Sequence, residues 1–430
     1  MGALLLGVCN DSLFHLRGTL SNNYSGWLSF QSGYRSDACG SAVDRVILYF
    51  LSVVRAIPPH QVTGLTLRRN SVKRSALCFA AIIACSALPL RGSACTYFAV
   101  STRAGEHMIG RSLEFGTESD GSPLKTAFKT VPRGQSHTSR TDEGVKPVTW
   151  TNRLGYFGPV HGEGTIFSEG MNEKGVSIAA LWLNDGVYPK PVSDTVNLSN
   201  ADVVEWILGQ FDSAKAAVDA LEGVHVSQHM TSLGIPLPLH WSVADKTGAS
   251  YVVEYIDGKL IVTDNSDLRV MTNSPRIEWQ RRNLAEFKSD FPQLDPASDQ
   301  RNPEFLSGLP GSVSSPARFL RVAIQRDLCG DVKDLPAALN TALHLLNSVD
   351  YVPGVPFVEG RGVSSGAQQT PWITVIDPHN LHYYFRTQDS MNVHKVDLTR
   401  LDFSEGARTT SFNPYGGSTF IDVTAEAMDK

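Results

Sequence analysis

Residues 95–116 read CTYFAVSTRAGEHMIGRSLEFG, and this stretch says more about the fold than any other. The apolar run at residues 96–100 predicts a buried β-strand. Residues 106–110 predict its antiparallel partner, because an Arg-Ala-Gly turn joins two runs of strand-forming residues. The sequence therefore predicts a β-hairpin with a cysteine, Cys95, directly before its first strand.

The residues before Cys95 have the features of a secretory signal peptide. Two basic residues precede the apolar run SALCFAAIIACSAL (75–88), and the small residues Gly-Ser-Ala follow it and end at Ala94. Signal peptidase prefers small residues at its cut site. We therefore expect a signal peptide at residues 71–94, cleavage after Ala94, and export to the periplasm or out of the cell.

Cleavage after Ala94 would give Cys95 a second chemical function. A thiol and a free α-amine would then share one residue. The α-amine has a reference pKa of about 7.7–8.0, so near neutral pH part of it is unprotonated and accepts the thiol proton. One cut would create a nucleophile and its base together.

Residues 1–70 form an N-terminal extension without a sustained helical or strand period. Signal peptides normally begin within a few residues of the first methionine, so this extension is either the product of an over-extended gene model or an unusual leader. The apolar run that follows it is shorter than a comfortable transmembrane span.

Composition limits the classes of protein that fit. The chain has 430 residues, and the 336 after Ala94 show no linker, so we expect one large domain at residues 95–430. The first 94 residues hold nine of the 38 basic and three of the 43 acidic residues, so the remainder has a net charge of −11. An acidic chain without basic clusters disfavours nucleic-acid binding and stable membrane insertion.

Cysteine usage fits a protein that keeps a thiol unpaired. Of the six cysteines, only Cys95 and Cys329 follow the expected cut, so no disulfide framework remains. We expect Cys329 to be a small apolar core residue near a helix end.

Strand and helix patterns alternate along the rest of the chain and predict an α+β fold. Strands are expected at residues 165–169, 176–181, 241–245, 251–255, 260–263, 371–376, 382–386 and 393–396. Helices are expected from a Ser199 cap to residue 210, from an Asp212 cap to Gly223, from Ser314 or Ser315 to Gly330, and over residues 335–349.

Several ordered motifs resemble the choloylglycine hydrolase family. They are the 95–116 stretch, GMNEKGVSIAALW (170–182), LHWSVADKTGASYVVEY (239–255), VMTNSP (270–275), GLPGSVSSPARFLR (308–321) and TPWITVIDPHNLHYYFRTQDSMNVHKVDL (370–398). The family contains conjugated bile acid hydrolases and penicillin V acylases, within the N-terminal nucleophile (Ntn) hydrolases. The resemblance implies an αββα sandwich, with two stacked antiparallel sheets between helical layers.

The resemblance also assigns catalytic residues. It implies that Cys95 is the nucleophile, that Arg111 stabilises its thiolate, and that Glu114 holds the terminal amine where most relatives carry Asp. Asn273 would donate its side-chain amide to the oxyanion, and Arg318 would be the second active-site arginine. Arg321, three residues later, is expected to be structural.

The substrate implied by the resemblance is a small amide. Penicillin V-like compounds and N-acyl-homoserine lactones are favoured, with conjugated bile salts as the alternative. Candidates for an aromatic acyl pocket, each of which also fits an ordinary core position, are Tyr97, Phe98, Phe115, Tyr156, Phe157 and Trp182. Trp182 could instead donate its ring N–H to the oxyanion. The resemblance implies no cofactor and no metal. Homotetramers are common in the family, although the sequence does not determine the oligomeric state.

Two other interpretations of Cys95 stay open. The segment Ile82-Ile83-Ala84-Cys85 is a degenerate lipobox, and lipidation at Cys85 would give a lipid-anchored, non-enzymatic exported protein with Cys95 inside the chain. In an unprocessed cytosolic relative, Cys95 would be only a strand thiol.

Two further motifs are interpreted as loops. Residues 362–366 (GVSSG) fit the serine-hydrolase elbow pattern, but no hydrophobic strand precedes them and no helix follows them. The segment 161–164 (HGEG) has no partner elbow. The 12 histidines are scattered and show no zinc-type spacing.

Overall fold

The computed structural model describes residues 2–9, 12–19, 94–116, 124–161, 166–228, 230, 236–302, 304–355, 357–358, 366–417, 420–421 and 423–424. The chain divides into two units, Met1–Pro89 and Leu90–Lys430. The expected signal peptide lies outside the described residues, apart from Ala94, as do residues 362–365 of the GVSSG motif.

The first unit contains a hairpin that the sequence analysis missed. Strand β1 (Gly2–Cys9) pairs antiparallel with β2 (Ser12–Thr19), with Cys9 opposite Ser12. The sequence analysis found no sustained strand period in residues 1–70, because each strand is short and β2 mixes polar with apolar residues. Two residues separate the strands, which is the spacing of a tight hairpin.

The second unit is built on two large antiparallel sheets. The nine-stranded sheet has the order β16-β15-β14-β11-β10-β8-β5-β22, with β9 paired to β8. Its strands are β5 (Thr126–Val131), β8 (Tyr156–His161), β9 (Ile166–Phe167), β10 (Glu169–Asn172), β11 (Ser177–Trp182), β14 (Leu239–Ala244), β15 (Ser250–Ile256), β16 (Lys259–Asp264) and β22 (Thr410–Phe412).

The seven-stranded sheet has the order β17-β3-β4-β19-β20-β21, with β18 paired to β19. Its strands are β3 (Ala94–Ser101), β4 (His107–Gly116), β17 (Val270–Thr272), β18 (Phe357–Val358), β19 (Gly366–Asp377), β20 (His382–Thr387) and β21 (Ser390–Asp397). Smaller pairs are β6 (Ser136–Thr138) with β7 (Thr149–Thr151), and the parallel pair β12 (Asn197–Ser199) with β13 (His225–Ser227).

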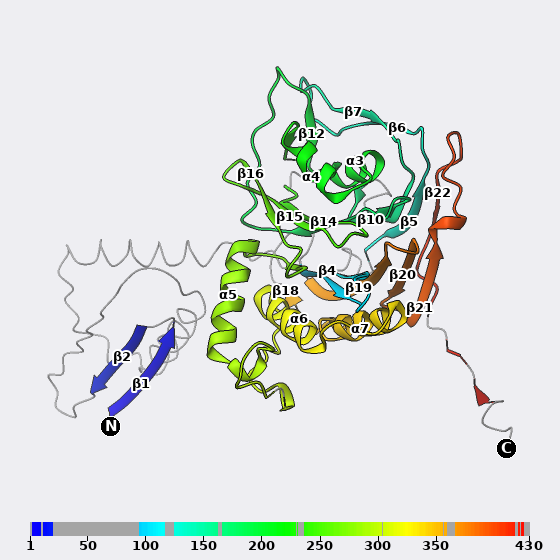
Figure 1. The fold of residues 1–430 in the computed structure, drawn as a ribbon. Coiled ribbons are helices and arrows are strands. Elements are labelled where there is room, and N and C mark those ends of the chain that lie inside the picture. The colour runs from blue at the N-terminus through cyan, green and yellow to red at the C-terminus, as the bar shows by residue number, and fades with distance from the viewer. Residues whose placement is uncertain are drawn as a thin grey trace, which may run out of the picture. The chain divides into compact units, whose positions relative to one another are not determined.

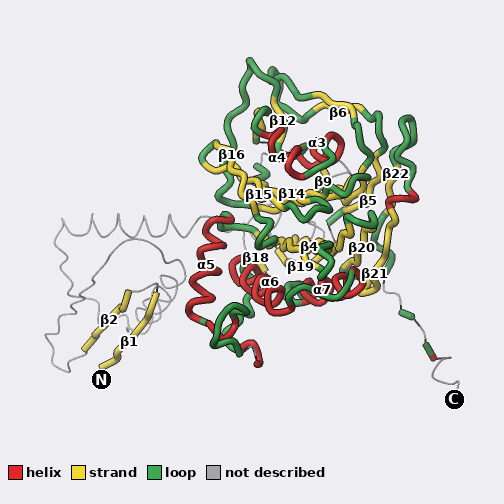
Figure 2. The backbone as a smooth tube through the Cα atoms, viewed as in Figure 1, coloured by secondary structure: helices red, strands yellow, loops and turns green. Residues whose placement is uncertain are grey.

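Helices cover the outer faces of both sheets. Helices α3 (Val203–Gln210) and α4 (Ala214–Leu221) lie over the nine-stranded sheet, and α6 (Ser315–Cys329) and α7 (Leu335–Asn347) lie over the seven-stranded sheet (Figure 1). Helix α5 (Ile277–Asp290) packs beside α6. Figure 2 shows the same succession of helix, strand, strand and helix layers. The expected αββα sandwich is confirmed.

Strand β11 shows how the sequence supports two cores at once. Its run SIAALW is buried throughout. Ala179 and Leu181 belong to the core that includes the space between the sheets, whereas Ile178 and Ala180 belong to the core under α3 and α4. Because side chains alternate along a strand, a strand buried on both faces needs a continuous apolar run.

Two predicted helix starts are wrong. Helix α3 begins at Val203 rather than after Ser199, because Ser199 ends β12. Helix α4 is capped by Ser213, whose side chain accepts the Ala216 N–H, rather than by Asp212. Serine and aspartate both cap helices well, so their spacing alone did not locate the first turn.

Helix α5 was not predicted, because only three of its residues are buried: Ile277, Gln280 and Leu284. Such a narrow stripe gives a weak helical period.

The bounds of the strands predicted at residues 165–169 and 176–181 differ in the structure. Ser168 separates β9 from β10, and it is β10 that pairs with β11.

None of the helices within the described ranges is both long enough and apolar enough to cross a membrane.

The close approach of β8 to β10 predicts a stability effect. A Cβ on Gly158 would lie 2.3 Å from the carbonyl oxygen of Glu169, which is backbone and does not rotate away. We expect Gly158→Ala to lower the free energy of unfolding by about 1–3 kcal/mol, as overpacking does. Urea titration measures the change. Gly223→Ala is the matched control, because its nearest non-local atom would be at an ordinary 3.6 Å. Equal stability of both variants would contradict the packing argument.

Candidate active site

Cys95 lies near the start of β3 and is 2% exposed. Antiparallel pairing places Tyr97 opposite Arg111 on β4. Cys95 and Tyr97 therefore point to the same face of the hairpin as Arg111. The Arg111 Nη2 atom lies 3.9 Å from the Cys95 sulfur. The structure thus brings the predicted nucleophile and the first predicted arginine together.

Arg111 is fully buried and joins both sheets. Its Nε atom forms an ion pair of 2.8 Å with Glu169 on β10, and its Nη2 atom donates to the carbonyl oxygen of Ala180 on β11 at 2.9 Å. The guanidinium carbon lies 4.7 Å from the ring centre of Trp372 on β19, a cation–π arrangement. These contacts fix the guanidinium beside the sulfur, so its position does not depend on a bound substrate.

Arg318 approaches Cys95 from the helical side of the same sheet. Its Nη1 atom donates to the Cys95 carbonyl oxygen and to Thr96 Oγ1, both at 2.6 Å. Its Nη2 atom donates to Asn273 Oδ1 at 3.1 Å. The second predicted arginine therefore binds the main chain of Cys95, while Arg111 lies beside its side chain.

Asn273 follows β17 and connects three parts of the site. Its Oδ1 atom accepts the Cys95 N–H in a short hydrogen bond, and its Nδ2 atom donates to the Trp182 carbonyl oxygen at 2.9 Å. The indole Nε1 of Trp182 donates to Asn184 Oδ1 at 3.0 Å. The Trp182 ring N–H therefore has a protein partner, which disfavours the alternative that it serves the oxyanion.

Glu114 lies opposite Ala94 in the β3–β4 register, and its side chain is fully buried. Among the described residues, neither carboxyl oxygen has a hydrogen-bond partner of good geometry, and Arg318 Nη1 is 3.9 Å away. Burial raises the pKa of Glu114 to about 7, although the charge of Arg318 acts in the other direction. In the strand register, Glu114 is the residue opposite Ala94, which precedes the peptide bond at which cleavage is expected.

The thiol of Cys95 is not activated in the uncut chain. Burial is the largest influence and raises the pKa of the thiol above its usual value, and the nearby Glu114 acts in the same direction. The charges of Arg111 and Arg318 lower it only in part. The site therefore holds a protonated thiol until its surroundings change.

The predicted aromatic pocket divides into different environments. Phe98 points to the opposite face of β3 from Cys95, and a Cβ on Gly110 would lie 2.6 Å from its ring. The structure therefore assigns Phe98 to the core rather than to an acyl pocket. Tyr97, Tyr156 and Phe157 are also fully buried core residues, whereas Phe115 is partly exposed. Trp182 is 5% exposed.

Two residues of the site were missed by the sequence analysis. Glu169 balances the charge of Arg111 and accepts hydrogen bonds from Thr374 Oγ1 at 2.6 Å and from Tyr383 Oη. The sequence signal that could have identified Glu169 was a single acidic residue in an otherwise apolar strand region. Tyr351 donates to the Val313 carbonyl oxygen, which also accepts from Arg318 Nε at 3.0 Å. No motif marked Tyr351.

Arg321 is structural, as expected, since it donates to the carbonyl oxygens of Pro310 and Ser312 in the loop before α6.

Cys329 was predicted to be a core residue, and this prediction is wrong. Its side chain is exposed at the end of α6 and lines a cavity of about 370 Å³. It is the last residue of α6, and the buried residues of that helix end at Ile324. His161 ends β8 and contacts Thr126 and Ser168, and the rest of its HGEG motif lies outside the described residues.

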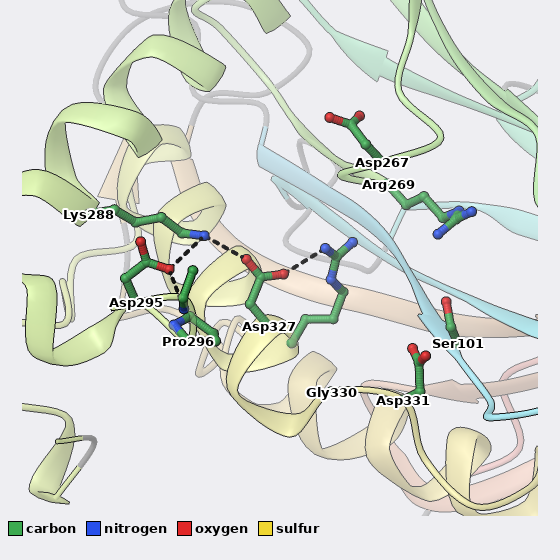
Figure 3. Close-up of a pocket in the computed structure, with 11 residues that line it drawn as sticks. Ser101, Asp267, Arg269, Lys288, Asp295, Pro296, Asp327, Gly330 and Asp331 are labelled. Atoms are coloured by element: carbon green, nitrogen blue, oxygen red, sulfur yellow. Dashed lines mark hydrogen bonds and ion pairs between the residues drawn. The ribbon is translucent and has the colours of Figure 1, made fainter. Parts of the chain in front are cut away.

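A charged cavity of about 380 Å³ lies at the other end of β3 (Figure 3). It contains Ser101, six residues from Cys95, or about 20 Å along an extended strand. Lys288 joins Asp327 at 2.9 Å and Asp295 at 3.6 Å across it. None of the predicted site residues lines this cavity. Within the described ranges, no group of three or more His, Cys, Asp or Glu side chains is arranged to hold a metal ion.

Comparison with known proteins adds the family context. The family model described as linear amide C–N hydrolases, choloylglycine hydrolase family, matches residues 95–411. A bile salt hydrolase/transferase of Clostridium perfringens is 28% identical over 74% of this chain and 97% of that protein. A penicillin V acylase of Pectobacterium atrosepticum is 28% identical over 58% of this chain and 64% of that protein.

Solved structures agree with these sequence matches. The penicillin V acylase from Agrobacterium tumefaciens has a TM-score of 0.61 and 25% identity, over 74% of this chain and 91% of that one. A mutant of the conjugated bile acid hydrolase from Clostridium perfringens has a TM-score of 0.63 and 25% identity, over 76% of this chain and 99% of that one.

The buried carboxyl of Glu114 predicts a pH dependence of stability in the uncut chain. Its pKa is about 7 when folded, above the 4.5 expected when unfolded, so between these values the folded state binds more protons. Stability should then fall by about 3 kcal/mol as pH rises from 4.5 to 7. Urea titrations at pH 5 and 7.5 measure this fall, and Glu114→Gln should remove it. An unchanged pH dependence in the variant would show that Glu114 is not its source.

Proposed function

The chain belongs to the choloylglycine hydrolase family of linear amide C–N hydrolases, and on that basis we propose that Cys95, exposed at the N-terminus by cleavage after Ala94, is its nucleophile. The observation that carries the proposal is the convergence of three side chains on this one residue. Arg111 lies at the sulfur, Asn273 at the main-chain nitrogen, and Arg318 at the main-chain oxygen. A structural strand cysteine would not require such contacts.

The reaction begins when the free α-amine of Cys95 takes the thiol proton, directly or through water. The thiolate attacks the amide carbon of the substrate, and the carbonyl π electrons move to its oxygen. The ammonium then protonates the leaving nitrogen as the C–N bond breaks, which leaves a thioester on Cys95. Water, deprotonated by the same amine, attacks the thioester, and the acid and the thiol are released.

Asn273 is suited to stabilise the oxyanion of each tetrahedral intermediate. A side-chain amide has two N–H donors. One is committed to the Trp182 carbonyl oxygen, and the second remains for the substrate. A preorganised donor of this kind contributes about 3 kcal/mol to transition-state stabilisation.

Cleavage also gives Glu114 a partner. In the uncut chain neither of its oxygens has a well-formed hydrogen bond with a described residue. A new ammonium at Cys95 would supply a positive charge at this end of the strand and favour the ionised carboxylate. The extra methylene of Glu, where most relatives carry Asp, lengthens the side chain by about one bond, and the carboxyl still reaches Arg318.

The proposed substrates are penicillin V-like amides and N-acyl-homoserine lactones. A relative and a solved structure with the names penicillin V acylase support the first class. Conjugated bile salts form the second candidate, because a bile salt hydrolase/transferase matches a larger share of this chain. Export to the periplasm or beyond is part of the proposal, since signal peptidase supplies the cut.

Replacing the nucleophile tests the mechanism. We expect Cys95→Ser to fold normally and to lose roughly a hundredfold or more of the turnover, because the amine base is far less able to deprotonate a hydroxyl than a thiol. Amine release from penicillin V measures the loss, and the unfolding midpoint controls for folding. Turnover retained at the wild-type rate would refute Cys95 as nucleophile.

The substrate class is tested with a panel of amides. Penicillin V and long-chain N-acyl-homoserine lactones should exceed glycine- and taurine-conjugated bile salts by about tenfold or more in kcat/KM. Fluorescent detection of the released amine compares all of them in one assay. A preference of that size for the conjugated bile salts would instead assign the chain to the second candidate.

A further inference from the structure

His240 on β14 and Glu254 on β15 form a buried pair that the reaction scheme does not use. They are 1% and 2% exposed, and His240 Nδ1 lies 3.2 Å from Glu254 Oε1. His240 stands opposite Leu181 across the β11–β14 pairing, and the next residue, Trp182, provides the carbonyl oxygen that holds Asn273. The pair therefore lies at the end of the nine-stranded sheet that is nearest to the catalytic residues.

Glu254 also holds the first turn of α5. Its Oε1 atom accepts the N–H of Ile277, the first residue of that helix, at 3.0 Å. The side chain of the residue at the N-cap position, Arg276, makes no capping hydrogen bond to the helix. An acceptor from the sheet thus replaces a local cap, and a carboxylate at a helix N-terminus is favourable.

Helix α5 in turn positions Asn273, which is four residues before Ile277. The Asn273 carbonyl oxygen accepts from Gln280 Nε2 on α5 at 3.4 Å and from Ser315 Oγ at the start of α6 at 2.8 Å. Ser274, between Asn273 and the helix, uses its Oγ to accept the N–H of Asn184 at 2.6 Å. Hydrogen bonds therefore connect the start of α5 to Asn273, whose side-chain amide would face the oxyanion.

We propose that Glu254, oriented by His240, is a positioning residue for the hydrolase: it fixes the start of α5 and thereby keeps Asn273 at the oxyanion. This inference rests on the proposed role of Asn273. Within the described part of the chain the His240 Nε2 atom has no hydrogen-bond partner, and the Nδ1 atom makes the polar contact of the ring, with Glu254. Neither residue touches the substrate in this account.

Removing the carboxyl should slow the chemical step more than it weakens binding. In Glu254→Ala the Ile277 N–H loses its acceptor and the turn that carries Asn273 relaxes. A displacement of about 1 Å at a catalytic group costs up to about a hundredfold in rate, so we expect kcat to fall by about 10- to 100-fold with KM within about threefold. Rates are expressed per Cys95 thiol labelled by a slowly hydrolysed amide analogue, so that unfolded molecules are not counted.

A conservative variant distinguishes positioning from charge. The hydrogen bonds from His240 Nδ1 and from the Ile277 N–H both end on Glu254 Oε1, and glutamine retains an oxygen at that position. Glu254→Gln should therefore recover kcat to within about threefold of wild type. If Glu254→Ala does not fold, His240→Phe carries the test, because it keeps a ring of similar size and removes the Nδ1 contact, and kcat should fall by about 3- to 10-fold.

Asp202 provides the matched control. It is also a buried carboxylate that accepts main-chain and side-chain hydrogen bonds, from Arg140 N at 2.6 Å and Ser139 Oγ at 2.8 Å, but it lies at the start of α3. Asp202→Ala should lower the unfolding temperature and leave kcat per labelled thiol unchanged. The proposal is overturned if Glu254→Ala turns over at the wild-type rate, if Asp202→Ala loses kcat equally, or if Glu254→Gln shows no recovery. If the proposed function itself is wrong, the wild-type protein already shows it, because the amide analogue then does not acylate its Cys95.

Discussion

The site depends on one buried cation between two sheets. Arg111 is held by Glu169 and by the Ala180 carbonyl oxygen on one sheet, stacks on Trp372 of the other, and reaches the sulfur of Cys95. An unpaired charge at this depth would cost several kcal/mol, so the ion pair with Glu169 is a condition for burying it at all. The sandwich therefore positions the guanidinium before any substrate arrives, and the proposed nucleophile, Cys95, lies beside it.

In the proposed mechanism, the same burial that organises the site keeps it inactive in the uncut chain. Burial raises the pKa of the Cys95 thiol and of the Glu114 carboxyl, and that carboxyl has no well-formed hydrogen bond with a described residue. Cleavage after Ala94 would add a base at the thiol and a cation near the carboxyl. In this account the fold supplies arginines and amide donors in advance, and proteolysis supplies the one group that is missing.

Local patterns predicted much of the fold but little of the site. The β3–β4 hairpin and the end of α6 at Gly330, with its positive φ of 63°, follow from turn and cap chemistry. Helix α5 was not predicted because its buried stripe is narrow and because its first turn is capped from a distant strand, by Glu254. Cys95 and Asn273 are 178 residues apart, so only the family resemblance joined them. Aromatic content left Phe98 between an acyl pocket and the core, because composition does not say which face of a strand a side chain occupies, whereas the alternation of side chains from Cys95 does.

The most direct test of this account is the N-terminal sequence and intact mass of the protein recovered after export. The account predicts that the mature chain begins at Cys95 with an unmodified α-amine. A chain that begins elsewhere, or that carries lipid on Cys85 with Cys95 still internal, would contradict it, since the thiol would then have no amine of its own to accept its proton.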